Sequence, residues 1–286
     1  MATTLTLRRR IKTAQNISKT TRAMQMIAAS KLKRAQEAAL MARPYVDKLI
    51  ELTHTLTVDD QETLHPYMKL RNDTKKTLYI VISPDKGLSG GLVTNLIREY
   101  LKHNHSDSYF ITIGKKIEGP VAATNKQLLA SFPFGSTLPA FDVVLPIIEI
   151  VDDYFLNEKV DAIKIITTHF NSVFSQSPTV IDLLPVQLTS KTEADQHASD
   201  VLLFEPKPTK LLPPLLKRYI EMVIYQQLLE SYVSEQASRM LAMQNATNNA
   251  KDIVNQLRLL YNKIRQEKIT NEILDISSAA VAMEKE

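Results

Sequence analysis

The sequence contains no cysteine and no tryptophan, and glycine accounts for only six of its 286 residues. The absence of cysteine excludes a disulfide framework and a thiolate metal site, and it is consistent with a reducing compartment. The sequence also lacks the run of roughly 18 to 20 apolar residues that a membrane-spanning helix needs. The closest approach, residues 141–156, contains four acidic residues and Pro146. We therefore expect a folded, soluble protein without a membrane-spanning helix.

Acidic residues are missing from the first 36 positions, which contain nine Lys and Arg residues although the whole chain has a net charge of only +4. A mitochondrial transit peptide is one interpretation, because such peptides are rich in arginine and poor in acids. A solvated helix face is a second interpretation, and a surface for an acidic partner is a third. The helical pattern continues past residue 36 without a break typical of cleavage sites. One-sided charge over this length favours the acidic partner.

Glycine and proline are confined to the middle of the chain. All six glycines lie between Gly87 and Gly135, the first proline is Pro44 and the last is Pro214. Glycine costs about 1 kcal/mol and proline about 3 kcal/mol inside a helix. The uninterrupted 43 residues at the start and 72 at the end therefore predict two long helices. A helix of about 70 residues is about 105 Å long, which exceeds what a globular core requires.

Small and apolar residues recur in both terminal stretches at alternating steps of four and three. The C-terminal positions are Ala246, Ala250, Ile253, Leu257, Leu260 and Ile264. The N-terminal positions are Leu7, Ile11, Ala14, Ser18, Thr21, Gln25, Ala28, Leu32, Ala35 and Ala39. This spacing is typical of the seam of a left-handed coiled coil. Small residues facing larger ones favour a close antiparallel pair of helices from the same chain.

The middle of the chain alternates between strand and helix patterns. Strands are expected over residues 77–83, 109–114, 161–169 and 179–188, and helices over 92–103, from about 115, and over 140–156. A polar stretch at 189–200 is expected to be a mobile loop before the prolines that open the last helix. The fold class is therefore α/β: a small, largely parallel, Rossmann-like domain at 75–190 and a long antiparallel coiled coil of helices at 1–60 and 209–286.

No catalytic, cofactor or metal site is predicted. The segment 84–91 follows the first strand, where a phosphate-binding loop would lie, because backbone N–H groups at a helix start favour anions. Its glycines fit neither the P-loop nor the dinucleotide fingerprint, so a tight structural turn is favoured. His103 and His105 would face different sides of a helix, which disfavours a metal pair. The hydrolase and metalloprotease motifs are absent, as are paired carboxylates in an acid–base setting.

Two other classes of protein fit the sequence poorly. A nucleic-acid-binding coiled coil usually interleaves aromatic residues with its basic ones, but residues 1–36 contain no aromatic residue. We therefore expect no nucleic-acid partner. A nucleotide-dependent α/β enzyme would need a phosphate fingerprint and catalytic groups, and the sequence provides neither.

Four segments carry a more specific pattern. They are RIKTAQNISKTTRAMQMIAASKL at 10–32, DKGLSGG at 85–91, SEQASRMLAMQNATNNA at 234–250 and YNKIRQEKITNEI at 261–273. Spread over nearly the whole chain and in this order, they resemble the gamma subunit of F-type ATP synthases. Lys86 and Ser89 stand where that family commonly has Arg and Cys. Ser278 replaces a usual Gly, which leaves open whether the chain stays helical to its end.

The resemblance implies a function. The coiled coil would stand inside a ring of three alpha and three beta subunits, and the α/β domain would contact the epsilon subunit and the membrane c-ring. Rotation of this central-stalk rotor would couple proton translocation to ATP synthesis or hydrolysis in the beta subunits. The chain itself would be non-catalytic and hold no cofactor. The lack of a cleavable leader favours a bacterial protein at the cytoplasmic side of the cell membrane, held there through the complex.

The resemblance also implies which residues contact other subunits. By motif match they are Lys19, Arg22, Met24, Lys31, Arg34, Arg239, Arg265, Gln266, Thr270 and Glu272. The alternative for each is packing in the seam of the coiled coil. The apolar C-terminal end, residues 273–283, is expected to form a bearing near the top of the ring.

Overall fold

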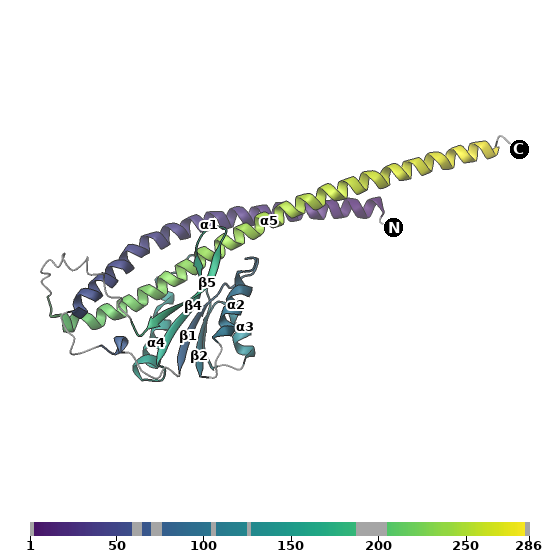
Figure 1. The fold of residues 1–286 in the computed structure, drawn as a ribbon. Helices are drawn as coiled ribbons and strands as arrows, with labels where there is room; N and C mark the ends of the chain where they lie inside the picture. The colour runs from purple at the N-terminus through teal and green to yellow at the C-terminus, as the bar shows by residue number, and fades with distance from the viewer. Residues whose placement is uncertain are drawn as a thin grey trace. The chain divides into compact units, whose positions relative to one another are not determined.

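The computed structural model describes residues 3–58, 65–69, 76–103, 107–124, 127–186 and 205–283. The chain divides into two compact units, residues 1–28 with 240–286 and residues 29–239, and each is described by itself. The two long helices α1 (Thr4–Val58) and α5 (Pro208–Met283) contribute to both units (Figure 1). The predicted loop at 189–200 and His105 lie outside the described residues. The three-domain division made from the sequence stays a prediction.

The two long helices confirm the expectation drawn from the distribution of glycine and proline. The first helix has 55 residues and continues through Pro44, which is exposed. The last has 76 residues, begins at Pro208 and contains Pro213 and Pro214 near its start. A proline in the first position of a helix is favourable, because that N–H has no partner in the helix. Helix α5 continues to Met283, so Ser278 does not end it.

A five-stranded sheet with the order β3-β2-β1-β4-β5 organises the unit formed by residues 29–239. Its strands are β1 (Thr77–Ile82), β2 (Ser108–Ile113), β3 (Gln127–Phe132), β4 (Ala162–Phe170) and β5 (Gln176–Leu184). The first four are parallel, and β5 is antiparallel to β4. This confirms the α/β fold class with a largely parallel sheet. The sequence analysis missed β3, because its half-exposed sequence QLLASF contains no β-branched residue.

The central strand β1 is almost entirely buried, because helices cover the sheet. Every residue of β1 from Leu78 to Ile82 is buried, as expected for a strand covered on both faces. One face packs on α2 (Leu92–Lys102) and α3 (Lys115–Ala123) through a cluster that includes Tyr79, Val81, Leu96 and Ile117.

A further helix, α4 (Leu145–Leu156), contributes four buried apolar residues. The expected helix at 140–156 is thus split into a 3-10 turn, η2 (Phe141–Val143), and α4. Pro146 lies in the first turn of α4, where its missing N–H is tolerated. A second 3-10 turn, η1 (Pro66–Met68), precedes the sheet.

In the unit formed by residues 1–28 and 240–286, α1 and α5 pair as an antiparallel coiled coil. The α1 seam follows the prediction: Leu7, Ile11, Ala14, Ser18, Thr21, Gln25 and Ala28 are all buried or half-buried. The α5 seam consists of Met243, Thr247, Ala250, Val254, Leu257, Tyr261 and Ile264. A hydrogen bond of 2.7 Å between the hydroxyls of Thr21 and Thr247 joins the two helices at this seam.

The predicted α5 seam was therefore half wrong. Ala250, Leu257 and Ile264 lie in it, but Ile253 is 49% exposed whereas its neighbour Val254 is 7% exposed. Four of the true positions directly follow a small or apolar residue (Ala242, Ala246, Ile253 and Leu260), so hydrophobicity alone could not choose between the two registers.

Among the described residues, no helix is both long enough and apolar enough to cross a membrane.

Candidate functional site

The first surface of interest is the basic face of α1 in the coiled-coil unit. Its exposed cations are Arg8, Arg9, Arg10, Lys12, Lys19 and Arg22. In the described part of the chain, none of these six takes part in an ion pair. Because like charges this close together repel each other, the face is suited to an anionic partner.

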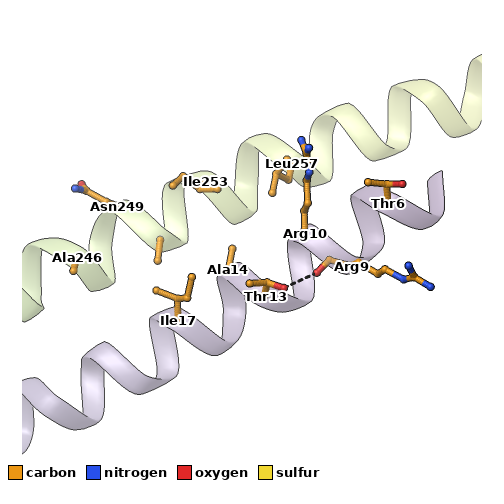
Figure 2. A pocket seen from close by; sticks show the side chains of 11 residues that line it. Thr6, Arg9, Arg10, Thr13, Ala14, Ile17, Ala246, Asn249, Ile253 and Leu257 are labelled. Carbon is orange, nitrogen blue, oxygen red and sulfur yellow. Dashed lines mark hydrogen bonds between the residues drawn. The ribbon is translucent and has the colours of Figure 1, made fainter. Parts of the chain in front are cut away.

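A groove beside the seam adds apolar surface to this basic face. It has a volume of about 580 Å³ and is lined by Thr6, Arg9, Arg10, Thr13, Ala14 and Ile17 from α1 and by Ala246, Asn249, Ala250, Ile253 and Leu257 from α5. Figure 2 shows Ile17 and Ile253 on facing helices. The same view shows the dashed bond from the Thr13 hydroxyl to the carbonyl of Arg9, which measures 3.1 Å. Four of the six residues predicted for the α5 seam, Ala246, Ala250, Ile253 and Leu257, thus line this groove.

Three of the predicted contact residues lie on this unit outside the seam. Lys19, Arg22 and Met24 are all exposed. The alternative role of seam packing therefore does not apply to them. They remain available to a partner.

Four more predicted contact residues, Arg265, Gln266, Thr270 and Glu272, lie beyond the paired part of α5. The seam ends at Ile264, and residues 265–277 are all exposed (Figure 1 shows α5 continuing past the N-terminus of α1). Among the described residues, the polar contacts of Thr270 and Glu272 lie along α5 itself: Thr270 Oγ1 donates to the carbonyl of Gln266 at 2.9 Å, and Lys268 pairs with Glu272 at 3.5 Å.

The same segment carries large apolar side chains. Ile269, Ile273, Leu274 and Ile276 are between 47% and 71% exposed. Exposed apolar residues gathered on one unpaired helix indicate an interaction surface. The predicted bearing extends to residue 283, but side chains beyond Ser277 lie outside the described set.

The remaining predicted residues belong to the unit of residues 29–239. Arg34 is exposed. Lys31 donates from Nζ to the carbonyl of Ser136 at 2.6 Å. Arg239 is only 17% exposed and forms an ion pair with Glu235 at 2.5 Å. Two of the ten predicted contact residues are thus engaged inside the chain.

The carboxyl edge of the sheet is where ligands usually bind in this type of fold. After β1 the chain adds β2 and β3 on one side of that strand, and then β4 and β5 on its other side. The topological switch point of the sheet is therefore between β1 and β4. Here α5 occupies that edge. Ser234 donates to the carbonyl of Thr168 at 3.0 Å, and Ser238 donates to the carbonyl of Ser89 at 2.6 Å.

The turn at 84–91 is held in place by hydrogen bonds from both sides. From α5, Nη2 of Arg239 donates to the carbonyls of Lys86 and Gly87, each at 3.3 Å. Within the sheet domain, Asp85 accepts the backbone N–H groups of Lys115, Phe134 and Gly135 at 2.8–3.2 Å. These contacts support the interpretation of the segment as a structural turn.

The pKa values of two carboxylates near this turn are shifted in opposite directions: that of Asp85 is lowered and that of Glu235 is raised. Burial raises the pKa of Asp85, but its three backbone hydrogen bonds outweigh that effect and the net pKa lies below the usual range. Burial also raises the pKa of Glu235, and the charge of Arg239 only partly opposes it. Glu235 is 3% exposed, so Arg239 is the group that makes its charge tolerable.

Neither Asp85 nor Glu235 was predicted as a site residue, although the sequence contains a signal for each. Asp85 directly follows a buried strand, where polar residues gather at the carboxyl edge. Glu235 precedes Arg239 by four residues, which is the spacing of a helical ion pair. Among the described residues, no cluster of three or more His, Asp or Glu side chains could hold a metal ion.

Comparisons with known proteins agree with this architecture. A family model described as ATP synthase matches residues 3–283. The ATP synthase gamma chain of Dehalococcoides mccartyi strain CBDB1 is 39% identical over 288 residues, covering 99% of this chain and 100% of the relative. That of Methylacidiphilum infernorum isolate V4 is 38% identical over 294 residues, again covering 99% and 100%.

Solved structures give the same result at the level of the fold. A chain of the Tetrahymena thermophila mitochondrial ATP synthase central stalk and c-ring aligns with a TM-score of 0.59 and 25% identity, covering 79% of this chain and 98% of that one. A chain of the Euglena gracilis mitochondrial enzyme aligns with a TM-score of 0.59 and 18% identity, covering 91% and 95%.

Proposed function

The chain belongs to the gamma-chain family of ATP synthases, and on that premise we propose that its coiled coil is the rotating shaft around which the alpha and beta subunits are arranged. The gamma chain is a non-catalytic subunit of the central stalk, and the catalytic sites of the complex are on beta. The chain would therefore carry rotation from the membrane c-ring to the catalytic ring. Proton translocation and ATP synthesis or hydrolysis are coupled in this way.

The observation that carries the proposal is the unpaired end of α5. Residues 265–277 are exposed throughout and include Ile269, Ile273, Leu274 and Ile276. A helix end with this much apolar surface gains stability from a surrounding sleeve, because burial contributes roughly 25 cal/mol per Å² of apolar area. The polar residues Arg265, Gln266, Thr270 and Glu272 on the same segment would fix its orientation within that sleeve.

The basic face of α1 supports a second set of contacts. Lys19 and Arg22 are exposed and positively charged, and Met24, two residues after Arg22, is exposed as well. Arg34, in the unit of residues 29–239, is a further exposed cation. Acidic loops of the ring would complement these charges. Arg239 and Lys31, which bond within the chain, would contact the ring less directly.

The α/β domain would contact the epsilon subunit and the c-ring. The Tetrahymena structure that resembles this chain contains a central stalk together with a c-ring, and the curated relatives reported above are bacterial. The gamma chain is part of the membrane-associated ATP synthase. We place this chain at the cytoplasmic side of a bacterial cell membrane, attached through the complex alone and without nucleic acid.

Co-purification from the native membrane tests this proposal. An affinity tag is inserted in the predicted loop at 189–200, and the proteins that copurify are identified. We expect alpha, beta and epsilon subunits in a complex that hydrolyses ATP. Recovery of the chain alone, or bound to nucleic acid, would contradict the assignment.

A further inference from the structure

We propose that Glu235 and Arg239, together with Ser238 and the turn at 84–91, form a joint that transmits torque between the α/β domain and α5. We call this set of contacts the joint. The inference rests on the proposed function as a rotor shaft and goes beyond it, because it assigns Arg239 a positioning role inside this chain. Sequence resemblance alone had placed Arg239 among the contacts with the surrounding ring.

The first argument is where the hydrogen bonds of Arg239 go. One nitrogen, Nη2, lies within hydrogen-bond distance of the carbonyls of Lys86 and Gly87 and of Oε1 of Glu235. The preceding residue, Ser238, donates to the carbonyl of Ser89 in the same turn of the chain. The turn at 84–91 is therefore bound to α5 at three of its carbonyl groups.

The second argument is burial. Glu235 is 3% exposed and the Arg239 side chain 17% exposed, so most of this ion pair is removed from water. Removing one partner of a buried pair leaves the other charge without compensation. A contact with the ring would need an exposed guanidinium, as Arg22 and Arg34 have.

The third argument is direction. A helix that packs only through apolar contacts can slide or turn relative to its neighbour at small cost, whereas hydrogen bonds weaken steeply when their angle changes. Within the joint, Ser238 and Arg239 contribute such bonds to the turn after β1, and one helical turn earlier Ser234 adds a bond from α5 to β4. It therefore resists rotation of the sheet about the helix axis.

The turn can carry this load because it is tied to the rest of the sheet domain. Asp85 connects it to the backbone after β2 and after β3. The neighbouring carbonyl of Ser136 accepts hydrogen bonds from Lys31 of α1 and from Tyr232 of α5. Force on the domain thus reaches both long helices through one connected set of polar contacts.

The test uses the complete ATP synthase in membrane vesicles, with ATP-driven proton pumping measured per ATP hydrolysed. We expect Arg239→Gln to lower this ratio several-fold while the complex still assembles. Arg239→Lys keeps the charge and should retain most of the ratio. If Arg239→Gln does not assemble, Glu235→Gln, which removes the same ion pair, takes its place in the cross-linking comparisons.

A reversible cross-link then separates the joint from a ring contact. The chain has no native cysteine, so Ser89→Cys and Ser238→Cys add its only thiols, in a complex whose other subunits lack reactive ones. In the Arg239→Gln background, oxidation should restore the pumping ratio, and reduction should lower it again. A cross-link that forms without restoring the ratio would overturn the proposal, as would failure of the pair to cross-link in the presence of Arg239.

A matched control is available in the coiled coil. Thr21→Cys with Thr247→Cys replaces two residues whose hydroxyls lie 2.7 Å apart and which do not belong to the joint. Its oxidation should leave the Arg239→Gln defect unchanged. Restoration by this pair would mean that general stiffening is sufficient, which would contradict the joint.

Coupling between the two charges gives an independent readout. In the joint, Glu235→Gln and Arg239→Gln remove the same contact. The pumping ratio of the double variant should therefore be no lower than that of the worse single variant. If the pumping ratio of the double variant instead falls by the product of the two single losses, Arg239 acts independently of Glu235, which would contradict the joint. Failure of the unmodified chain to assemble with alpha and beta subunits would instead contradict the proposed function and leave these ratios unmeasurable in any variant.

Discussion

At the scale of single residues, the α/β domain depends on polar groups that fix loops rather than bind ligands. Asp85 is the clearest case, since one side chain accepts hydrogen bonds from three backbone N–H groups in two different loops. Gly114 fixes the backbone in a different way: its φ is +99°, and an added Cβ would lie 1.9 Å from the carbonyl oxygen of Ser83, so the position requires glycine. Both residues lie at the carboxyl edge of the sheet, beside the turn that α5 binds.

Replacing Asp85 should destabilise the domain in a pH-dependent way. We expect Asp85→Asn to lower the free energy of unfolding by about 1–3 kcal/mol at neutral pH, because bonds to a charged acceptor are lost. The folded-state pKa of Asp85 is lowered, so its contribution is present above the unfolded pKa and disappears as pH falls through the folded pKa. Denaturation of the purified chain at several pH values measures this. The exposed Asp107→Asn is the control, and an equal, pH-independent loss in both variants would contradict the account.

Gly114 and Gly119, five residues apart in the sequence, should respond in opposite directions to replacement by alanine. Gly114→Ala forces a side chain into a left-handed conformation against the Ser83 carbonyl, and we expect a loss of more than about 2 kcal/mol. Gly119 lies inside α3 with no atom within 4 Å of an added Cβ. Gly119→Ala should therefore gain up to about 1 kcal/mol from helix propensity. Thermal unfolding of both variants checks the sign of each change.

At the scale of secondary structure elements, the pairing of α1 and α5 is decided by size as much as by hydrophobicity. The α1 seam contains small residues such as Ala14, Thr21 and Ala28, whereas the α5 seam contains larger ones such as Met243 and Val254. A hydroxyl pair, Thr21 with Thr247, takes a position that an apolar pattern would not select.

The position of the α5 seam predicts that Ile253 and Val254, although adjacent, contribute unequally to stability, because only Val254 is buried. Val254→Ala should cost about 1–2 kcal/mol of unfolding free energy, because it empties a buried position. Ile253→Ala removes a larger side chain but an exposed one, so it should cost less than about 0.5 kcal/mol. Thermal unfolding of the two variants decides the matter. A larger loss for Ile253→Ala would restore the seam that the sequence pattern predicted.

The elements themselves were largely predictable, and their partners were not. The positions of Gly and Pro predicted both long helices, and β-branched apolar runs located β1, β2 and β4. Strand β3 was missed because a half-exposed edge strand needs few β-branched residues, as its sequence QLLASF shows. The engagement of Arg239 was hidden because its acceptors, the carbonyls of Lys86 and Gly87, are about 150 residues away and every residue type has a carbonyl.

At the scale of the whole molecule, the chain presents two surfaces that its own fold does not use. One is the basic face of α1, and the other is the end of α5 after Ile264. As a shaft within a ring, the chain would bury both. In the described part of the α/β domain, α5 occupies the edge of the sheet where ligands bind in folds of this type.

The α5 end should be sensitive to loss of its polar side chains. We expect the double variant Gln266→Ala with Thr270→Ala to slow ATP hydrolysis or uncouple it from proton pumping in the reconstituted complex, because both side chains are exposed and would contact the ring. Asn248→Ala with Asp252→Ala, an exposed pair with the same spacing in the paired part of α5, is the comparison. Unchanged turnover and pumping in the first pair would remove these residues from the contact surface.

Rotation itself is the most direct measurement of the central claim. Phe174→Cys places a single thiol on an exposed hairpin of this cysteine-free chain, and a visible probe attached there is followed while the alpha and beta ring is fixed to a surface. The account predicts that the probe turns in one direction while ATP is hydrolysed and stops when hydrolysis is inhibited. A probe that stays fixed relative to the ring during sustained hydrolysis would contradict it.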